Sequence, residues 1–223
     1  MNLKKMLMFL DDDELRQVAQ KIIDGSEEYS GITLTSLLPF MDEDDVDDLI
    51  VDIYHRVGNP EAILPFASED GAARLAWELI EKEPPQMITG VLPFMDEDDV
   101  DKLFITLAER GMVIEEMYPF VSEDGFHEVV EGYLKGRFDF DFSSALPFMD
   151  DDDIDDLFVA LAQKGAAPAE MYPFVSEDGF HKVLKGYLAG QYDFDFDEAY
   201  PYMDEDDIRK LFRNEIGKRR SGH

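Results

Sequence analysis

The sequence predicts an all-α protein, a right-handed αα-superhelix of about eight repeats, each pairing a short helix with a longer one. Two observations support this: an aromatic residue follows a proline in a motif that recurs along the chain, and helical hydrophobic periodicity follows each copy. The spacing of the prolines alternates between 26 and 28 residues, so two units form a 54-residue super-repeat. A fixed period of this size is typical of helical arrays. The repeated prolines are Pro39, Pro65, Pro93, Pro119, Pro147, Pro173 and Pro201.

A strong N-cap residue lies three positions after each of these prolines. Its side-chain oxygen can accept hydrogen bonds from the free backbone N–H groups of a first helical turn. The residue before the cap and the fourth residue after it are apolar, as in Met95 and Val100, which is the spacing of a hydrophobic staple. The predicted caps, with one near the N-terminus that lacks its proline, are Asp11, Asp42, Asp96, Asp150 and Asp204 in one set and Ser68, Ser122 and Ser176 in the other.

Apolar residues after each cap follow the i, i+3, i+4, i+7 spacing, as in Val46, Leu49, Ile50 and Ile53. This spacing places them on one helix face, which must be buried. Glycines stand where a left-handed residue commonly ends a helix, at Gly25, Gly111, Gly136, Gly165 and Gly190. Long helices are therefore expected over residues 12–24, 43–57, 69–82, 97–110, 123–135, 151–164, 177–189 and 205–217.

Short helices are expected before each Pro-Phe motif. One set would begin at the caps Thr35, Thr89, Ser143 and Asp197, and the other at Pro60 and Pro168, with proline in the first helical position. The proline of each Pro-Phe motif should end the short helix, because the residue before a proline disfavours the helical conformation. Residues 138–142 and 192–196 alternate aromatic and acidic residues, so we expect extended connectors whose rings fill the gaps between repeats.

Helix pairs this short cannot bury an apolar stripe alone, so neighbouring repeats must stack. In this respect the whole chain resembles the αα-solenoid proteins of the HEAT and leucine-rich-repeat-variant kind, at the level of architecture. The resemblance implies a curved scaffold whose concave surface grips a protein or peptide. A single domain is expected, with a degenerate N-terminal repeat over 1–34, regular repeats over 35–200, and a capping helix with a basic tail over 201–223.

The formal net charge of −32 argues against direct nucleic-acid binding and against binding to an anionic membrane. The chain has no cysteine and no apolar run long enough for a signal peptide or a membrane span, so a cytoplasmic location is expected. Six of the 20 basic residues lie in the last 15 positions, where they can bind the acidic body of a neighbouring copy in a salt-sensitive way. They are Arg209, Lys210, Arg213, Lys218, Arg219 and Arg220.

Acidic clusters at the helix starts are the strongest candidate for a binding surface. Capping and the helix dipole use one or two acids per helix, and these clusters contain four to six. The surplus suits a basic protein or peptide partner, a mimic of nucleic acid that occupies another protein's basic groove, or simple solubility, including adaptation to high salt. We prefer the first because the acids concentrate at helix starts. The predicted partner-binding residues are Asp44, Asp45, Asp48, Asp98, Asp99, Asp101, Asp152, Asp153 and Asp156.

No catalytic, cofactor-binding or metal-binding residues are predicted, so we expect a non-enzymatic protein without a cofactor. The acidic clusters lack the loop glycine and the distant glutamate of an EF-hand. His127 and His181 lie 54 residues apart, and we interpret them as one boundary residue copied by duplication. Glycines inside the expected helices are interpreted as close helix–helix contacts; they are Gly125, Gly132, Gly179 and Gly186.

Overall fold

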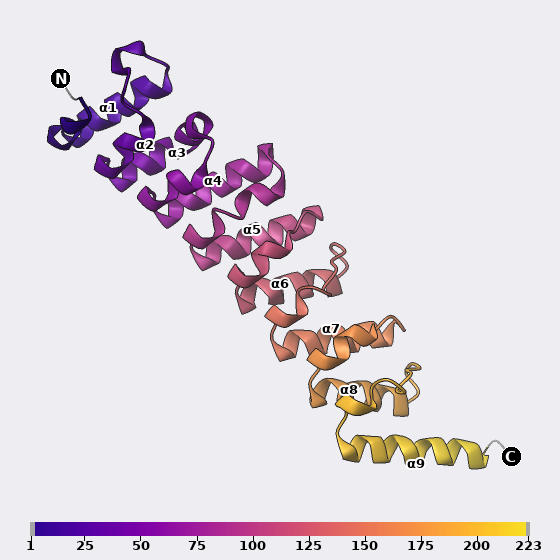
Figure 1. Cartoon of the computed structure of the whole chain (residues 1–223). Coiled ribbons are helices and arrows are strands. Elements are labelled where there is room, and N and C mark those ends of the chain that lie inside the picture. Colours follow the sequence, from indigo (N-terminus) through magenta and orange to yellow (C-terminus); the bar gives the residue numbers. More distant parts are fainter. Residues whose placement is uncertain (1–2, 222–223) are drawn as a thin grey trace. The chain divides into compact units, whose positions relative to one another are not determined.

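The computed structural model describes residues 3–221, and all regular secondary structure in this range is helical (Figure 1). This confirms the all-α helical-repeat prediction. The α-helices are α1 (Asp12–Ile23), α2 (Leu34–Leu37), α3 (Glu43–Val57), α4 (Glu69–Lys82), α5 (Glu97–Arg110), α6 (Glu123–Leu134), α7 (Asp151–Gln163), α8 (Glu177–Leu188) and α9 (Glu205–Ser221). The expected long helices agree with these bounds within one residue, except that α9 continues four residues further.

Short 3₁₀ helices lie in the segments outside the α-helices. They are η1 (Leu3–Lys5), η2 (Leu7–Phe9), η3 (Glu27–Tyr29), η4 (Leu38–Phe40), η5 (Pro60–Ala62), η6 (Leu64–Phe66), η7 (Pro85–Ile88), η8 (Leu92–Phe94), η9 (Glu115–Phe120), η10 (Leu146–Phe148), η11 (Ala169–Phe174) and η12 (Tyr200–Tyr202).

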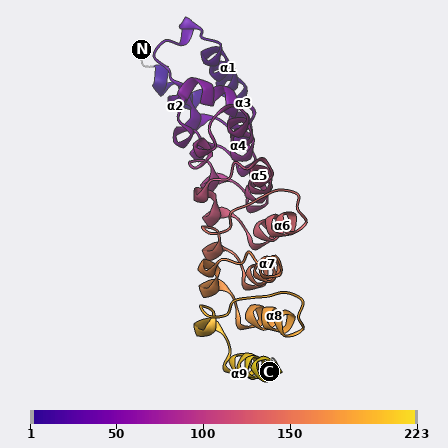
Figure 2. The ribbon, with the colours of Figure 1, turned by 90° about the vertical axis from the view of Figure 1, so that its right-hand side faces the viewer.

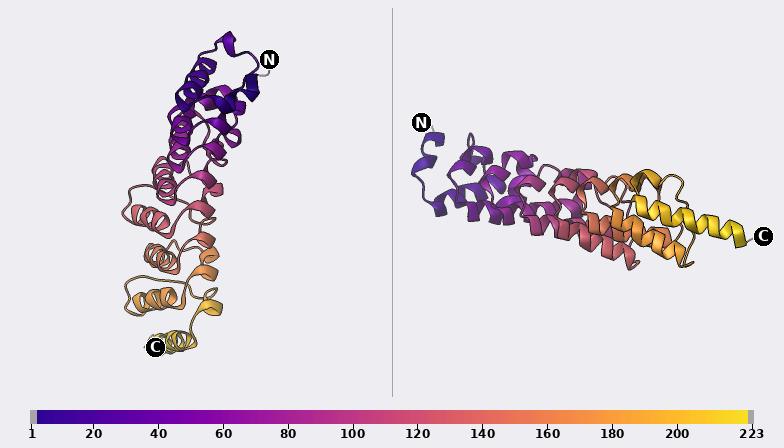
Figure 3. Two further views of the ribbon diagram at one scale, coloured as in Figure 1. Left: turned by 90° about the vertical axis from the view of Figure 1, so that its left-hand side faces the viewer. Right: turned by 90° about the horizontal axis from the view of Figure 1, so that it is seen from below.

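The chain divides into two compact units. Unit 1 comprises the described residues up to Leu107 together with Met112–Ser122, and unit 2 comprises Ala108–Gly111 together with the described residues from Glu123 onward. Within each unit the long helices form one layer and the 3₁₀ helices form a second layer beside it (Figures 2 and 3). The expectation of a single domain stays a prediction.

The starts and ends of the long helices follow the predicted chemistry. Asp11 accepts a hydrogen bond from the Glu14 backbone N–H at 2.9 Å, and Asp150 accepts one from the Asp153 N–H at 2.7 Å. The five predicted terminal glycines all have a positive φ. Gly58, which was not predicted, ends α3 in the same way with a φ of 70°.

The predicted caps of the short helices are wrong. Thr89 lies at the C-cap of η7 and does not begin a helix. Thr33 rather than Thr35 caps α2, and the carboxylate of Asp141 accepts from the backbone N–H of Ser143 at 3.0 Å. Pro168 occupies the cap position of η11 instead of its first helical position. Apart from α2, the short segments are 3₁₀ helices, which are tighter than the expected α-turns.

The Pro-Phe motif does not end the short helix, contrary to the sequence-based expectation. Leu38, directly before Pro39, has helical dihedral angles of φ −45° and ψ −43°, and Leu38–Phe40 forms a 3₁₀ helix. The turn is closed by the Met41 N–H, which donates to the Leu38 carbonyl at 3.2 Å. Proline fits the middle of this turn because its missing N–H would have no partner there.

The apolar stripes form the core of each unit. Val46, Ile50 and Leu75 are fully buried in unit 1, as are Leu157 and Val183 in unit 2. No helix among residues 3–221 is both long enough and apolar enough to cross a membrane.

The aromatic connectors contribute to the same core, as predicted. Phe142 is buried with its ring centroid 5.3 Å from that of Tyr133. Phe196 is buried at the same distance from Tyr187.

Candidate functional site

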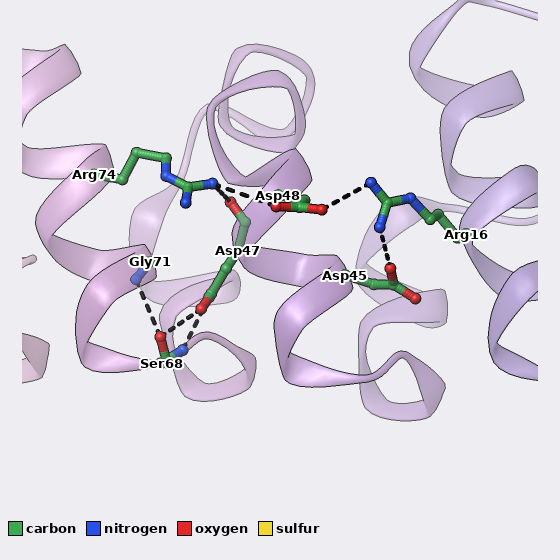
Figure 4. Close-up of polar contacts among 7 residues, drawn as sticks. All are labelled: Arg16, Asp45, Asp47, Asp48, Ser68, Gly71 and Arg74. Carbon is green, nitrogen blue, oxygen red and sulfur yellow. Dashed lines mark hydrogen bonds and ion pairs between the residues drawn. The ribbon is translucent and has the colours of Figure 1, made fainter.

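The long helices of each unit are joined near their N-termini by a repeated carboxylate–serine contact. We number helix positions from the N-cap, so that Asp47 is position +5 after Asp42. Asp47 lies on α3 and accepts hydrogen bonds from the backbone N–H of Ser68, at 3.0 Å, and from its hydroxyl (Figure 4). Ser68 is the N-cap of α4, so this contact seats the start of one helix against the second turn of its predecessor.

The contact repeats at equivalent positions. The Ser122 N–H donates to Asp101 at 2.9 Å, and the Ser176 N–H donates to Asp155 at 3.0 Å. All three aspartates are buried. A buried carboxylate must be hydrogen-bonded to be tolerated, and here the next helix start supplies the donors.

Glycine at position +3 of the serine-capped helices is required by this contact. A Cβ atom on Gly71 would overlap the Asp47 carboxylate, and one on Gly179 would overlap Asp155. The expected close helix–helix contact is therefore present at Gly179. Gly132 and Gly186 were also predicted to make close helix–helix contacts, but they face aromatic rings of the connectors instead. Gly132 lies against Phe138, and Gly186 lies against Tyr192.

At three of the four described junctions from a long helix to the following aspartate-capped helix, a basic side chain bridges the two helices; at the junction of α4 with α5 the corresponding residue is Ala73. Position +5 pairs with the aspartate at position +3 of the next long helix. Arg16 pairs in this way with Asp45 (Figure 4), and the His127 Nδ1 lies 2.7 Å from an Asp153 carboxylate oxygen. His181 repeats the contact with Asp207 at 2.8 Å. The two histidines are thus more than duplicated boundary residues, since both link neighbouring helices.

The electrostatics of the two histidine junctions differ. The hydrogen bond to Asp153 raises the pKa of His127 above its ordinary value of 6.5, with smaller contributions from Glu131 and Asp150. Burial raises the pKa of Asp153 and outweighs the hydrogen bond from His127. Its second carboxylate oxygen is buried and has no hydrogen-bond partner.

Asp207 is better satisfied than Asp153. Burial alone would raise the pKa of Asp207, but the hydrogen bonds from Lys210 and His181 hold it below its ordinary value. Lys210 reaches the carboxylate at 2.6 Å from position +6. The same position after Asp150 is Asp156, which can only repel Asp153.

The His127–Asp153 contact predicts a pH-dependent stability of unit 2. Because the folded-state pKa of His127 is raised, the contact stabilises the fold fully below the ordinary histidine pKa, and its contribution is lost as the pH rises through the folded-state value. We expect His127→Gln to lower the free energy of unfolding more at about pH 6 than at about pH 8.5. Urea unfolding of wild type and variant at both pH values measures this difference.

His55→Gln is the matched control, because His55 is exposed and forms no ion pair among the described residues. Its replacement removes a histidine without removing a contact to a carboxylate, so the difference between the two variants reports the His127–Asp153 contact. Equal pH dependence in the two variants would show that the contact with Asp153 is not responsible.

The predicted partner-binding residues separate into three groups by exposure. Asp101 and Asp153 are only 9% and 4% exposed, so these two are corrected: they hold helices together and do not face a partner. Asp45 and Asp99 are half-buried, and Asp45 pairs with Arg16. The exposed members are Asp44, Asp48, Asp98, Asp152 and Asp156.

Asp48 and Asp156, at position +6, already have basic partners. Asp48 lies 2.8 Å from Arg16 and 3.8 Å from Arg74, and Asp156 lies 3.5 Å from Lys182. The correction has a physical reason: position +3 or +5 faces a neighbouring long helix, whereas positions +1 and +2 face away from both neighbours.

Positions +1 and +2 of all eight long helices are acidic and exposed. We call these residues the acid edge of each unit. The sequence-based selection included only Asp44, Asp98 and Asp152 among them and missed all those of α1, α4, α6, α8 and α9, although counting from the N-caps would have found them. In unit 1 the acid edge is Asp12, Asp13, Glu43, Asp44, Glu69, Asp70, Glu97 and Asp98, and in unit 2 it is Glu123, Asp124, Asp151, Asp152, Glu177, Asp178, Glu205 and Asp206.

Most acid-edge carboxylates have no basic partner. Within the described part of the chain only Glu205 and Asp206 form ion pairs, both with Arg209. No group of three histidine, aspartate or glutamate side chains in residues 3–221 is placed to hold a metal ion. The edge therefore offers rows of solvated negative charge at helix starts.

Comparison of the chain with family models, with curated proteins and with solved structures gives no match.

Proposed function

We propose that this protein is a non-catalytic scaffold that binds a basic protein or peptide along an acid edge. The observation that carries the proposal is the pair of exposed acids at positions +1 and +2 of every long helix, almost all without an intramolecular partner. Acids at positions +3, +5 and +6 form hydrogen bonds or ion pairs between neighbouring helices, as Asp153, Asp47 and Asp48 do. The acids at positions +1 and +2 have no such structural role apart from their favourable interaction with the helix dipole.

Helix packing supports recognition by an extended row of charges. Packed helices lie about 8–10 Å apart, so neighbouring long helices within a unit present acid pairs at intervals that lysine and arginine side chains of one partner segment can span. Each exposed ion pair contributes only about 0.2–1 kcal/mol, so binding requires several pairs at once. Association should accordingly be fast and weakened by salt.

Neutralising the acid edge of α7 and α8 tests the proposal. The four-residue variant Asp151→Asn, Asp152→Asn, Glu177→Gln and Asp178→Asn removes four charges without touching a helix junction. We expect it to lose at least about tenfold in affinity for a basic protein captured from a source lysate in a salt-sensitive manner. Isothermal titration calorimetry of the purified basic protein with wild type and with the variant gives the change in affinity.

The control variant removes the same number of exposed acids from unit 2, all of them outside the long helices. Its substitutions are Asp139→Asn, Glu170→Gln, Asp193→Asn and Glu198→Gln. Equal losses in both variants would mean that net charge alone matters and would contradict recognition by the edge.

The identity of the captured protein separates the two functional hypotheses. A basic protein that does not bind nucleic acid supports the scaffold. A nucleic-acid-binding protein that DNA or RNA displaces from the acid edge supports the alternative, a mimic that occupies a basic groove.

A further inference from the structure

We propose that copies of this chain associate head to tail, with the outer face of α9 packing on the outer face of α1 in a second copy, in the register of the internal repeats. The proposal goes beyond the scaffold function and does not use the acid edge. It rests on two open apolar faces and on an exchange of charge between the residues that would meet.

The outer face of α9, which contains Phe212, exposes an apolar residue at a position that other long helices bury. Position +8 of an aspartate-capped helix is fully buried in Ile50 of α3 and Phe158 of α7, where the next long helix covers it. On α9 this position is Phe212, which is 66% exposed. Among the described residues it is the one position +8 of an aspartate-capped helix that is exposed.

A hollow of about 400 Å³ lies beside this residue. Apolar side chains line much of it, among them Phe194, Phe196, Ile208 and Leu211.

The outer face of α1 is open in a matching way. Met6, five residues before its N-cap, is 46% exposed, whereas the equivalent residues Ile63, Met117 and Met171 are buried. A hollow of about 380 Å³ adjoins it, and its lining includes Glu14 at position +3 and Gln17 at position +6.

Positions +3 and +6 indicate that this hollow is where a preceding long helix would pack against α1. In α4 the same positions are Gly71, which lies against Asp47, and Arg74, which donates to the Asp47 backbone carbonyl at 2.7 Å. Both contacts are with α3, the helix that precedes α4.

The residues that would meet have complementary charges. At internal junctions onto a serine-capped helix, position +5 of the first helix is aspartate and the N-cap of the next is serine, as in Asp47 and Ser68. On the two outer faces these residues are Arg209 and Asp11. The internal hydrogen bond would thus be replaced by an ion pair between copies. Arg209 is exposed and pairs only within its own first turn, so it can exchange partners.

The kind of assembly follows from the geometry. The two faces differ, so each associated pair retains one free face of each kind and can add further copies. We expect an open series of oligomers that grows with concentration. The net charge of −32 opposes close approach, so association should be measured at about 0.15 M salt, where the screening length is about 8 Å.

Sedimentation velocity of the full chain over a range of concentrations tests the proposal. Wild type should show a weight-average sedimentation coefficient that rises with concentration. Arg209→Asp should weaken association at least about tenfold, because it places two carboxylates together. Lys185→Asp, with the same charge change at an exposed site on α8, should have little effect. Circular dichroism confirms that each variant is folded.

A rescue variant tests the register directly. Adding Asp11→Ser and Glu14→Gly to Arg209→Asp recreates the internal junction of aspartate, serine and glycine, and should restore association. A tail that binds acidic surface without a defined register would not be rescued.

Three outcomes would overturn the proposal. They are a wild type that stays monomeric at all concentrations, equal effects of Arg209→Asp and Lys185→Asp, and a triple variant that behaves like Arg209→Asp. None of them depends on the capture of a basic partner, so failure here is distinguishable from failure of the scaffold function.

Discussion

Replacing Gly71 with alanine is expected to lower the free energy of unfolding by about 2–3 kcal/mol. Helix propensity alone predicts the opposite sign, since alanine is favoured over glycine inside a helix by about 1 kcal/mol. The added methyl group would overlap the Asp47 carboxylate, which cannot retreat without losing its hydrogen bonds to Ser68 (Figure 4). Overpacking against a buried, hydrogen-bonded group therefore outweighs propensity.

A double-mutant cycle isolates this effect. Asp47→Ala alone should cost about 2–4 kcal/mol, because it removes two hydrogen bonds to a carboxylate and leaves the donors of Ser68 unpaired. In that background Gly71→Ala should be neutral or stabilising by up to about 1 kcal/mol, because the clash is gone. Chemical denaturation followed by circular dichroism gives the four free energies.

Gly217→Ala is the control for propensity, because Gly217 lies in α9 with open space where a Cβ atom would be. This variant should not be destabilised. The proposed clash would be contradicted if Gly71→Ala lowered the free energy of unfolding equally in the wild-type and Asp47→Ala backgrounds.

Phe158→Ala is expected to cost about 3–5 kcal/mol, the largest effect of any single substitution considered for this protein. Phe158 is 0% exposed, and its ring lies 5.0 Å from that of Phe180 and 5.8 Å from those of Tyr172 and Phe194. Truncation leaves a cavity between α7, α8 and the following connector. The rings around it also lose their edge-to-face contacts.

Phe212→Ala is the matched comparison, because it removes the same side chain from position +8 of α9. Phe212 is exposed, so its loss should change the free energy of unfolding by no more than about 0.5 kcal/mol in dilute, unassociated protein. Similar losses for the two variants would show that the outer face of α9 is covered within the molecule, which would also remove the basis for head-to-tail association.

Much of the fold could be predicted from the sequence because its signals are local. The N-caps, the terminal glycines and the 3.6-residue stripes each act within one or two turns. They therefore placed the long helices within a residue of their observed bounds, except at the end of α9. The 3₁₀ turns at the Pro-Phe motifs were missed because the residue before a proline generally disfavours the helical conformation. Here Leu38 is helical, in a turn that the Met41 N–H closes by donating to the Leu38 carbonyl.

Which acids are buried at helix junctions and which are exposed could not be predicted in the same way. Asp153 and Asp152 are neighbours in an unbroken acidic run, yet one is buried against His127 and the other is exposed. The repeat period predicts that helices stack, but it does not give the relative rotation and axial offset of two packed helices. Those quantities decide which carboxylates face a neighbour.

The sequence by itself determined the helices, their limits and the repeating unit, because backbone capping and amphipathic periodicity are satisfied within a single helix. Only the tertiary structure decided that positions +3 and +5 hold helices together while positions +1 and +2 stay free, and that Phe212 lacks the cover given to Phe158. The physical reason is that burial and desolvation of a side chain depend on atoms from the adjacent helices, which the local pattern does not specify.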